Sequence, residues 1–194
     1  MHKQLITLAA MLTFGFASAG FAADNTAMSK DAYKAAKDKI EASYKADKKA
    51  CDGMKDNAKD ICKAEAKGKE KVAKAELESQ YKPSPRNDEK VAMAKADAEY
   101  DVAKEKCEDQ KGNAADVCKK DAKATHETAK AQAKAKVAAN TKGTNSPAAA
   151  DARQDAKQDA ADAQYSAAKE RCDSMKGDAK DKCVADAKKK FNKS

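Results

Sequence analysis

Apolar residues recur at intervals of three or four positions over most of the chain, with charged residues between them. Positions at this spacing lie on one face of an α-helix, so the pattern predicts amphipathic helices. One stripe consists of Met93, Ala96, Tyr100, Ala103 and Cys107, and another of Cys118, Ala122, Ala129 and Ala133. Because alanine is so frequent in these stripes, two helices that face each other can approach closely. We therefore expect helix pairs with a thin apolar interface, in which tyrosine is the largest side chain.

The same pattern occurs three times, in a frame that reads Y-x6-C-x10-C. The frame consists of Tyr44, Cys51 and Cys62, then of Tyr100, Cys107 and Cys118, and finally of Tyr165, Cys172 and Cys183. These are the six cysteines of the chain. The agreement indicates a three-fold internal repeat, in which the three tyrosines serve the packing of the helices.

Two geometries fit cysteines that are eleven residues apart. In an unbroken helix they would lie about 16 Å apart, which is too far for a disulfide. In a helical hairpin they face each other across the turn. Gly112-Asn113 and Gly177-Asp178 favour the hairpin, because glycine suits the end of one helix and Asn or Asp caps the next. In the first repeat Asp56 replaces the glycine, while Asn57 keeps the predicted cap.

We predict that each hairpin is closed by its own disulfide: Cys51–Cys62, Cys107–Cys118 and Cys172–Cys183. Closing a loop of this size stabilises a fold by about 3 kcal/mol in the entropic account. With 37% charged residues, 5% aromatic residues and no Trp, the chain has little else with which to build a core. Alanine and lysine favour helices, so the predicted fold is all-α: three tandem disulfide-stapled hairpins, coiled-coil-like, joined by flexible linkers.

Residues 1–22 are expected to be a signal peptide, with Lys3 before an apolar run and with cleavage after Ala22, or alternatively after Ala19. The apolar run is too short for a permanent span, so no transmembrane segment is expected once the signal is removed. An even number of closely paired cysteines in an exported chain is typical of structural disulfides in an oxidising compartment. We therefore predict a periplasmic or secreted protein.

Prolines and small polar residues divide the rest of the chain. The predicted units are helical repeat 1 at 23–81, a linker at 82–87, helical repeat 2 at 88–139, a linker at 140–150 and helical repeat 3 at 151–194. Corresponding cysteines are 56 residues apart between the first two repeats and 65 between the last two, and the surplus falls beside the second linker. Insertion there is typical of a flexible joint between semi-independent units.

The sequence offers little that could carry catalysis. His126 is the one histidine after the predicted signal peptide, and we expect it on a solvated helix surface. Carboxylates with lysines three or four residues away are typical of surface ion pairs. Zinc sites and thiol-disulfide catalysts usually place two cysteines two residues apart, a spacing that differs from the one found here. We therefore expect no enzyme, no cofactor and no metal site.

The net charge of +8 is the one compositional property that points toward a partner. The run Lys188-Lys189-Lys190 could attract lipopolysaccharide, acidic polysaccharide or phospholipid head groups. Nucleic acid is not the expected partner, because phosphate-specific binding depends on arginine or aromatic stacking, and both are scarce here. The expected partner is a protein or an anionic envelope component, whose identity stays open.

Two helical segments resemble known families. KAEAKGKEKVAKAE, from Lys63 to Glu76, is similar in composition to the long helical stalk of the periplasmic envelope protein TolA. THETAKAQAKAK, from Thr125 to Lys136, resembles the eleven-residue repeats of late embryogenesis abundant proteins, which implies a desiccation or stress protectant. Both resemblances cover helices only and imply no catalytic residue.

These observations predict a non-enzymatic, exported helical repeat protein of Gram-negative type that is a structural or interaction module of the cell envelope. Two alternatives stay open. One is a stress-protective chaperone or protectant of exported proteins, and the other is a binder of anionic envelope polymers or of metal. Exposed alanine stripes could also pair between two chains, which leaves a homodimer open.

Overall fold

The computed structural model describes residues 28–143 and 145–193, and all regular structure in them is helical. The helices are α1 (Lys30–Ala50), α2 (Asp56–Tyr81), α3 (Pro85–Cys107), α4 (Asn113–Lys142), α5 (Pro147–Cys172) and α6 (Asp178–Lys190). A short 3₁₀ turn, η1 (Cys51–Gly53), directly follows α1. The predicted all-α class is confirmed. The predicted signal peptide, residues 1–22, lies outside the described residues.

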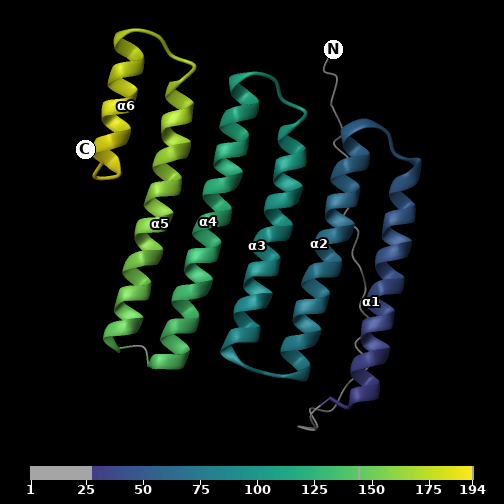
Figure 1. Cartoon of the computed structure of the whole chain (residues 1–194). Coiled ribbons are helices and arrows are strands. Elements are labelled where there is room, and N and C mark those ends of the chain that lie inside the picture. The colour runs from purple at the N-terminus through teal and green to yellow at the C-terminus, as the bar shows by residue number, and fades with distance from the viewer. Residues whose placement is uncertain (1–27, 144, 194) are drawn as a thin grey trace, which may run out of the picture.

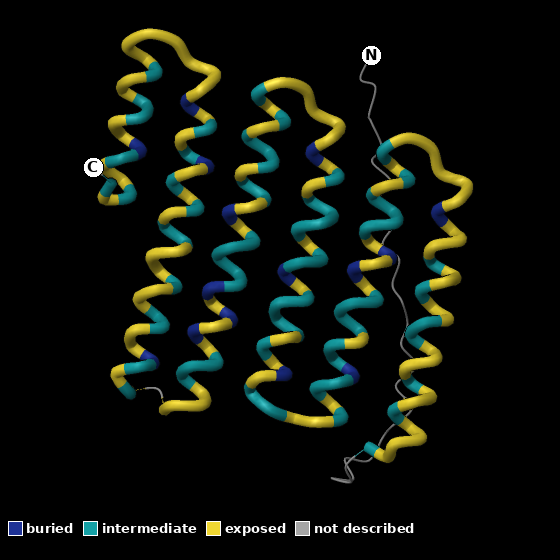
Figure 2. Tube along the Cα trace, viewed as in Figure 1, coloured by how far each residue is buried: buried dark blue, intermediate teal, exposed yellow. Residues whose placement is uncertain are grey.

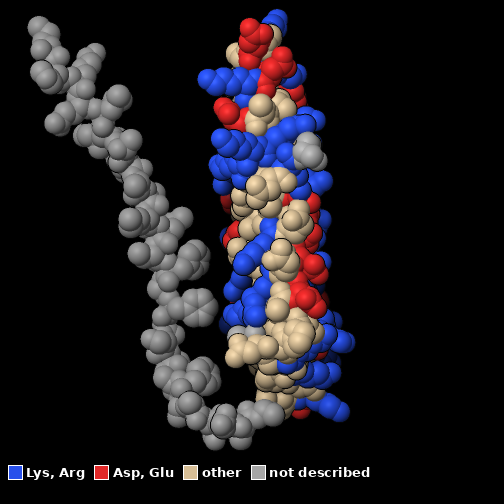
Figure 3. Space-filling model, turned by 90° about the vertical axis from the view of Figure 1, so that its left-hand side faces the viewer, with Lys and Arg blue, Asp and Glu red and all other residues tan. Residues whose placement is uncertain are grey.

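The helices stand side by side in a single row, and each packs against the next one in the chain (Figure 1). Short connections make consecutive helices antiparallel neighbours. The turns that carry the cysteines lie along one edge of the row, and the α2–α3 and α4–α5 connections lie along the opposite edge. Seen from the side of α6, the row is a narrow layer (Figure 3). The hairpins therefore form one continuous layer that is one helix thick.

Buried residues are scattered singly along the helices of this layer (Figure 2), and large apolar side chains contribute little to its interior. The buried apolar residues are Cys51, Ala66, Leu77, Ala96, Cys107, Ala124, Ala131, Ala133, Ala135, Ala149, Ala167, Cys172 and Ala187. Because alanine buries little apolar area, hydrophobic burial alone stabilises the layer weakly. No helix in the described part of the chain has both the length and the apolar character needed to cross a membrane.

Each hairpin is closed by the predicted disulfide: Cys51–Cys62, Cys107–Cys118 and Cys172–Cys183. The paired Cα atoms lie 5.6 to 5.7 Å apart, within the usual range for a disulfide. The first cysteine of every pair is fully buried: Cys107 and Cys172 end α3 and α5, and Cys51 begins the η1 turn directly after α1. The prediction of three disulfide-stapled helical hairpins is therefore confirmed.

A residue in the left-handed region opens the returning helix of every hairpin. Gly112 and Gly177 have φ of 55° and are the N-cap residues of α4 and α6. In the first hairpin Asp56 adopts φ of 49° after the η1 turn. Glycine adopts a positive φ without steric cost, and Asp is one of the few other residues found with φ in this range. The first hairpin therefore reverses the chain direction as the other two do, but with a 3₁₀ turn and an Asp instead of a Gly.

An ion pair spans each turn beside the disulfide. The acid directly after the first cysteine pairs with a lysine of the returning helix: Asp52–Lys59 at 3.9 Å, Glu108–Lys119 at 3.0 Å and Asp173–Lys180 at 2.8 Å. The hydrogen bond from Lys180 lowers the pKa of Asp173. The stabilisation from the Asp173–Lys180 pair is therefore present above the pKa that Asp173 has in the unfolded chain. It is lost as the pH falls through the lower pKa that Asp173 has in the folded protein. Because these pairs are exposed, each contributes little, and less at high salt.

The helices extend further into both predicted linkers than the prolines suggested. Ser84 and Ser146 are N-caps whose hydroxyl oxygens accept hydrogen bonds from the N–H groups of Asn87 and Ala149. The proline after each serine is the first residue of a helix, where its missing N–H would have no intrahelical partner. The connections therefore shrink to residues 82–84 and 143–146.

Small residues let neighbouring hairpins approach closely. A Cβ atom added to Gly68 of α2 would lie 2.8 Å from the Cβ atom of Ala98 of α3, which is closer than such atoms pack. Three contacts between polar side chains cross the same junction: Lys71–Asp101 at 3.3 Å, Lys95–Glu76 at 2.7 Å and Ser79–Asp88 at 2.7 Å. The hairpins are therefore packed against one another, a point that the sequence pattern left open.

The close contact between α2 and α3 predicts the effect of adding one methyl group. Gly68→Ala should destabilise the layer by about 1–3 kcal/mol through overpacking, although alanine is favoured over glycine by about 1 kcal/mol in an isolated helix. Thermal unfolding followed by circular dichroism measures the change. Combining Gly68→Ala with Ala98→Gly moves the methyl group across the junction and should recover part of the loss. A raised melting temperature in Gly68→Ala alone would show that the junction is loose.

The central disulfide should matter more than the ion pair beside it. Replacing Cys107 and Cys118 together by Ser should lower the free energy of unfolding by about 3 kcal/mol, because the unfolded chain regains its freedom. Chemical denaturation of the oxidised protein measures this change. Lys119→Gln, which removes only the adjacent ion pair, should have a much smaller effect, because that pair is exposed to solvent. Equal losses in the two variants would contradict the proposed role of the disulfide.

Candidate functional site

The disulfide sets the register of each hairpin, and this register brings aromatic rings together. Tyr100 lies seven residues before the first cysteine of its frame, and His126 lies eight residues after the second. Their ring centroids are 4.6 Å apart and their planes differ by 16°. Tyr165 and Phe191 hold the same two positions in the third hairpin, with centroids 6.3 Å apart. Two of the three tyrosines predicted to pack therefore make ring contacts across their hairpins.

The first hairpin uses a different aromatic pair. Tyr44 is half-buried and lines a cleft between α1, α2 and α3, and Glu70 stands where the other hairpins have a ring. Further from the disulfide, Tyr33 and Tyr81 have ring centroids 4.4 Å apart. The hydroxyl of Tyr33 donates to Glu78 at 2.9 Å, and this hydrogen bond raises the pKa of Tyr33.

His126 lies in the α3–α4 interface, so the expectation of a solvated surface histidine is wrong. Its side chain is only 10% exposed, and its Nε2 lies 2.6 Å from Oδ1 of Asp97. Its Nδ1 lies 3.4 Å from Oε1 of Glu127. The hairpin register places this position against Tyr100, and the imidazole fills the space that an apolar ring fills in the third hairpin. His126 is therefore a packed residue of the interface between α3 and α4.

The residues predicted to cap the returning helices lie inside them. Asn113 and Asp178 are the first residues of α4 and α6, because Gly112 and Gly177 take the N-cap positions. Asn57 is the second residue of α2, and its Nδ2 donates to the carbonyl oxygen of Glu105 in α3 at 2.7 Å. Asn57 therefore joins the first hairpin to the second. Sequence reasoning missed this contact because the partner lies 48 residues away.

Three neighbouring cavities of the layer share lining residues. The cavity between α2 and α3 has a volume of about 620 Å³, and it shares Ala103 and Lys106 with a cavity of about 710 Å³ beside the second disulfide. The latter shares Asp121, Thr125 and Arg171 with a third cavity of about 630 Å³, between α4, α5 and the end of α6. All three are wide open to solvent, and their volumes fall within the range of ligand pockets.

The exposed surface of the α2–α3 cavity is mainly apolar, although half of its lining residues are charged. Its apolar lining consists of Gly68, Val72, Ala73, Ala98, Val102 and Ala103, and its charged lining of Glu65, Lys69, Glu76, Lys95, Glu99 and Lys106. The ion pair between Lys95 and Glu76, at 2.7 Å, crosses between its two helices. This cavity suits an apolar side chain and offers few directional contacts.

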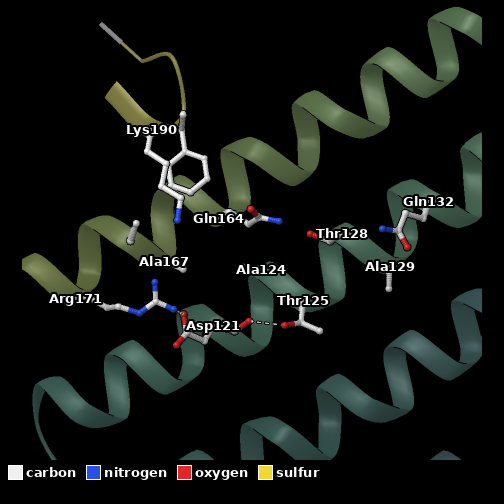
Figure 4. Close-up of a pocket in the computed structure, with 12 residues that line it drawn as sticks. Asp121, Ala124, Thr125, Thr128, Ala129, Gln132, Gln164, Ala167, Arg171 and Lys190 are labelled. Carbon is white, nitrogen blue, oxygen red and sulfur yellow. Dashed lines mark hydrogen bonds and ion pairs between the residues drawn. The ribbon is translucent and has the colours of Figure 1, made fainter. Parts of the chain in front are cut away.

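The α4–α5–α6 cavity is polar and chemically varied (Figure 4). Its polar lining consists of the cations Arg171 and Lys190, the carboxylate Asp121, the amides Gln132 and Gln164, and the hydroxyls Thr125 and Thr128. The ring of Phe191 and four alanines complete the lining. These groups come from three helices, so they meet only in the folded layer. This cavity is the strongest candidate for a binding site.

The two cations of this cavity differ in their partners. Arg171 Nη2 lies 2.5 Å from Oδ1 of Asp121, so these charges compensate each other across the α4–α5 junction. Lys190 Nζ lies 5.3 Å from the ring centroid of Phe191. Among residues 28–143 and 145–193, no carboxylate lies within ion-pair distance of Lys190. Figure 4 shows Lys190 extending from α6 toward α5, so the cavity carries one positive charge in excess.

Thr128 has a hydroxyl group without a hydrogen bond. A threonine inside a helix usually bonds to the carbonyl four residues earlier, as Thr125 does to Asp121 and Thr141 does to Val137. The Oγ1 atom of Thr128 is buried and has no partner, and it is the one such side-chain atom among the described residues. Gln164 extends toward it from α5 (Figure 4). Buried polar atoms without a partner are rare and call for an explanation.

The repeat pattern gave no signal for this cavity. The position ten residues after the second cysteine holds Val72, Thr128 and Lys193 in the three repeats, and the position before the first cysteine holds Ala50, Lys106 and Arg171. Only the basic run that contains Lys190 stood out in the sequence, and it did so by charge alone. No group of three or more His, Cys, Asp or Glu that could hold a metal ion occurs in the part of the chain that the structure describes.

Comparisons with known protein families, with curated proteins and with solved structures find no match to this chain. The geometry described above is therefore the basis for assigning a function.

The position of His126 predicts how it responds to substitution. His126→Phe should keep most of the stability, because Phe191 fills the equivalent position in the third hairpin. His126→Ala should lower the free energy of unfolding by about 1–3 kcal/mol, because it removes the ring contact and leaves a cavity. Denaturation followed by circular dichroism separates the two variants. A Phe variant as unstable as the Ala variant would show that the polar contacts of His126 matter more than its packing.

Proposed function

We propose that this chain is a non-enzymatic helical scaffold that is exported to the periplasm and is a structural or interaction module of the bacterial cell envelope. The observation that carries the proposal is the disulfide-closed layer, one helix thick, with three cavities that adjoin through shared lining residues. A layer of stacked helical pairs presents an extended surface to a partner, as other helical repeat architectures do.

The chemistry of the described residues favours binding over catalysis. Every described cysteine is in a disulfide, and His126 is held between Asp97 and the ring of Tyr100. Binding requires only shape, charge and hydrogen-bonding groups, and the α4–α5–α6 cavity supplies all three.

Two features support export. Three disulfides favour an oxidising compartment such as the periplasm, because cytosolic thiols are kept reduced. Residues 1–22 have the charged start, apolar run and small residues of a cleavable signal. The exported protein would then act in the periplasm or outside the cell.

The surface charge supports an anionic envelope component as partner. Lys and Arg number 40 against 32 Asp and Glu, and both signs are interspersed on the α6 side of the layer (Figure 3). An interspersed surface with a positive excess attracts polyanions without forming a single dense basic patch. Diffuse charge of this kind does not distinguish one anion from another, so selectivity requires a specific binding cavity.

Export and oxidation are tested together by expressing the full chain in a Gram-negative host and releasing the periplasm by osmotic shock. The expected product is found in that fraction, begins after Ala22, and has the mass of the remaining chain less the six hydrogens lost in three disulfides. Non-reducing peptide mapping should link cysteines only within hairpins. An uncleaved chain with free thiols in the cytoplasm would contradict the proposal.

A further inference from the structure

We propose that the α4–α5–α6 cavity binds a sugar that carries a negative charge, such as a uronic acid or a sugar phosphate. The inference rests on the proposed function, because it names the class of envelope component that the helical layer recognises. Four kinds of group in one cavity support it: cations, amides, hydroxyls and an aromatic ring.

The two cations of the cavity can bind the negative group of the ligand. Lys190 has no carboxylate partner in the described residues, and its ammonium group stands at the cavity beside the ring of Phe191. Arg171 lines the same cavity, and only its Nη2 bonds to Asp121. A guanidinium group has five N–H donors, so donors remain for a carboxylate or phosphate. The ligand group would therefore lie between one free and one partly engaged cation.

The neutral polar groups of the cavity can form hydrogen bonds with the hydroxyl groups of the ligand. Gln132 and Gln164 each offer a donor and an acceptor, which is the combination that a sugar hydroxyl requires. Thr128, whose hydroxyl lacks a partner, would gain one if it turned into the cavity toward a bound hydroxyl group. A simple inorganic anion would leave these amides unused, so they favour a larger, hydroxylated ligand.

The ring of Phe191 provides an apolar wall next to the positive charge. Lys190 Nζ lies 5.3 Å from the ring centroid, so an apolar surface and a cation are adjacent in the same cavity. A sugar acid has a matching pair of features, because one face of its ring presents C–H groups and its charged group projects from the ring edge. The α2–α3 cavity lacks an aromatic ring and amides in its lining, so it is a poorer match.

The test is titration calorimetry of the oxidised full chain with glucuronate, glucose 6-phosphate, glucose and inorganic phosphate. We expect both charged sugars to bind, and glucose and phosphate each to bind at least about ten-fold more weakly, since each supplies only part of the contacts. Lys190→Gln should weaken binding of the charged sugars about ten-fold, as the loss of a charge-assisted contact implies. Asp121→Asn should strengthen binding, because it removes the carboxylate that competes for Arg171.

Lys189→Gln is the matched control, since it makes the same change of charge one residue away, outside the cavity. It should change affinity by less than about two-fold if the binding is local, because exposed charges are screened by salt. Gln164→Ala should weaken binding of the charged sugars and leave that of phosphate unchanged. All variants should melt within a few degrees of the parent protein, which excludes loss of fold as the cause.

Several outcomes would overturn the inference. Equal effects of Lys190→Gln and Lys189→Gln would show diffuse charge attraction instead of a site. Phosphate binding as tight as that of the charged sugars would show a simple anion site, and absence of binding at millimolar sugar would show no site. These results leave the export and disulfide measurements untouched, so failure of the site and failure of the proposed function are distinguishable.

Discussion

The disulfide in each hairpin fixes which residues of its two helices face each other, and the other contacts within the hairpin follow from this register. Alanine stripes do not select a register by themselves, because one helix can slide past the other by a turn with little change in buried area. The covalent bond removes that freedom. The pairs Tyr100–His126 and Tyr165–Phe191 then lie at equal distances from their disulfides. Tyr33 and Tyr81 meet eleven residues further along each helix of the first hairpin, about three turns from that position.

Each disulfide of the described residues lies within one hairpin, so the backbone is the only covalent link from one described hairpin to the next, and small residues let the hairpins pack together. The position six residues after the second cysteine holds Gly68 in the first repeat and Ala124 in the second, and both are buried. The third repeat has Lys189 at this position, exposed on α6 at the edge of the row. A long charged side chain there does not permit the close approach seen between α2 and α3. A small residue at this position therefore marks a helix that packs against the next hairpin, and the lysine marks the helix at the outer edge. The terminal units of helical repeat proteins likewise have a polar outer face.

The sequence was sufficient to predict the helices, the hairpins and all three disulfides, because each depends on a spacing that recurs in the repeats. The two linkers were predicted too long, since Pro85 and Pro147 were interpreted as helix breakers, whereas Ser-Pro starts a helix when the serine caps it. The prediction that His126 lies on a solvated surface was wrong, because its packing partner Tyr100 lies on another helix. That pairing can be predicted only once the register of the two helices is known. The contact of Asn57 with α3 was missed for the same reason.

The candidate site arises where the third hairpin departs from the other two. The returning helices α2 and α4 have 26 and 30 residues, but α6 has only 13. Because α6 is so short, Lys190 and Phe191 lie at its end, and both line the space between α4 and α5. Arg171 and Thr128 complete this cavity at positions that hold other residue types in the remaining repeats. Residues that recur in the repeats build the layer, and residues that break the repeat give one of its cavities a distinct chemistry. In a layer of similar hairpins with few large side chains, such departures are where a specific binding site can form without weakening the contacts that hold the helices together.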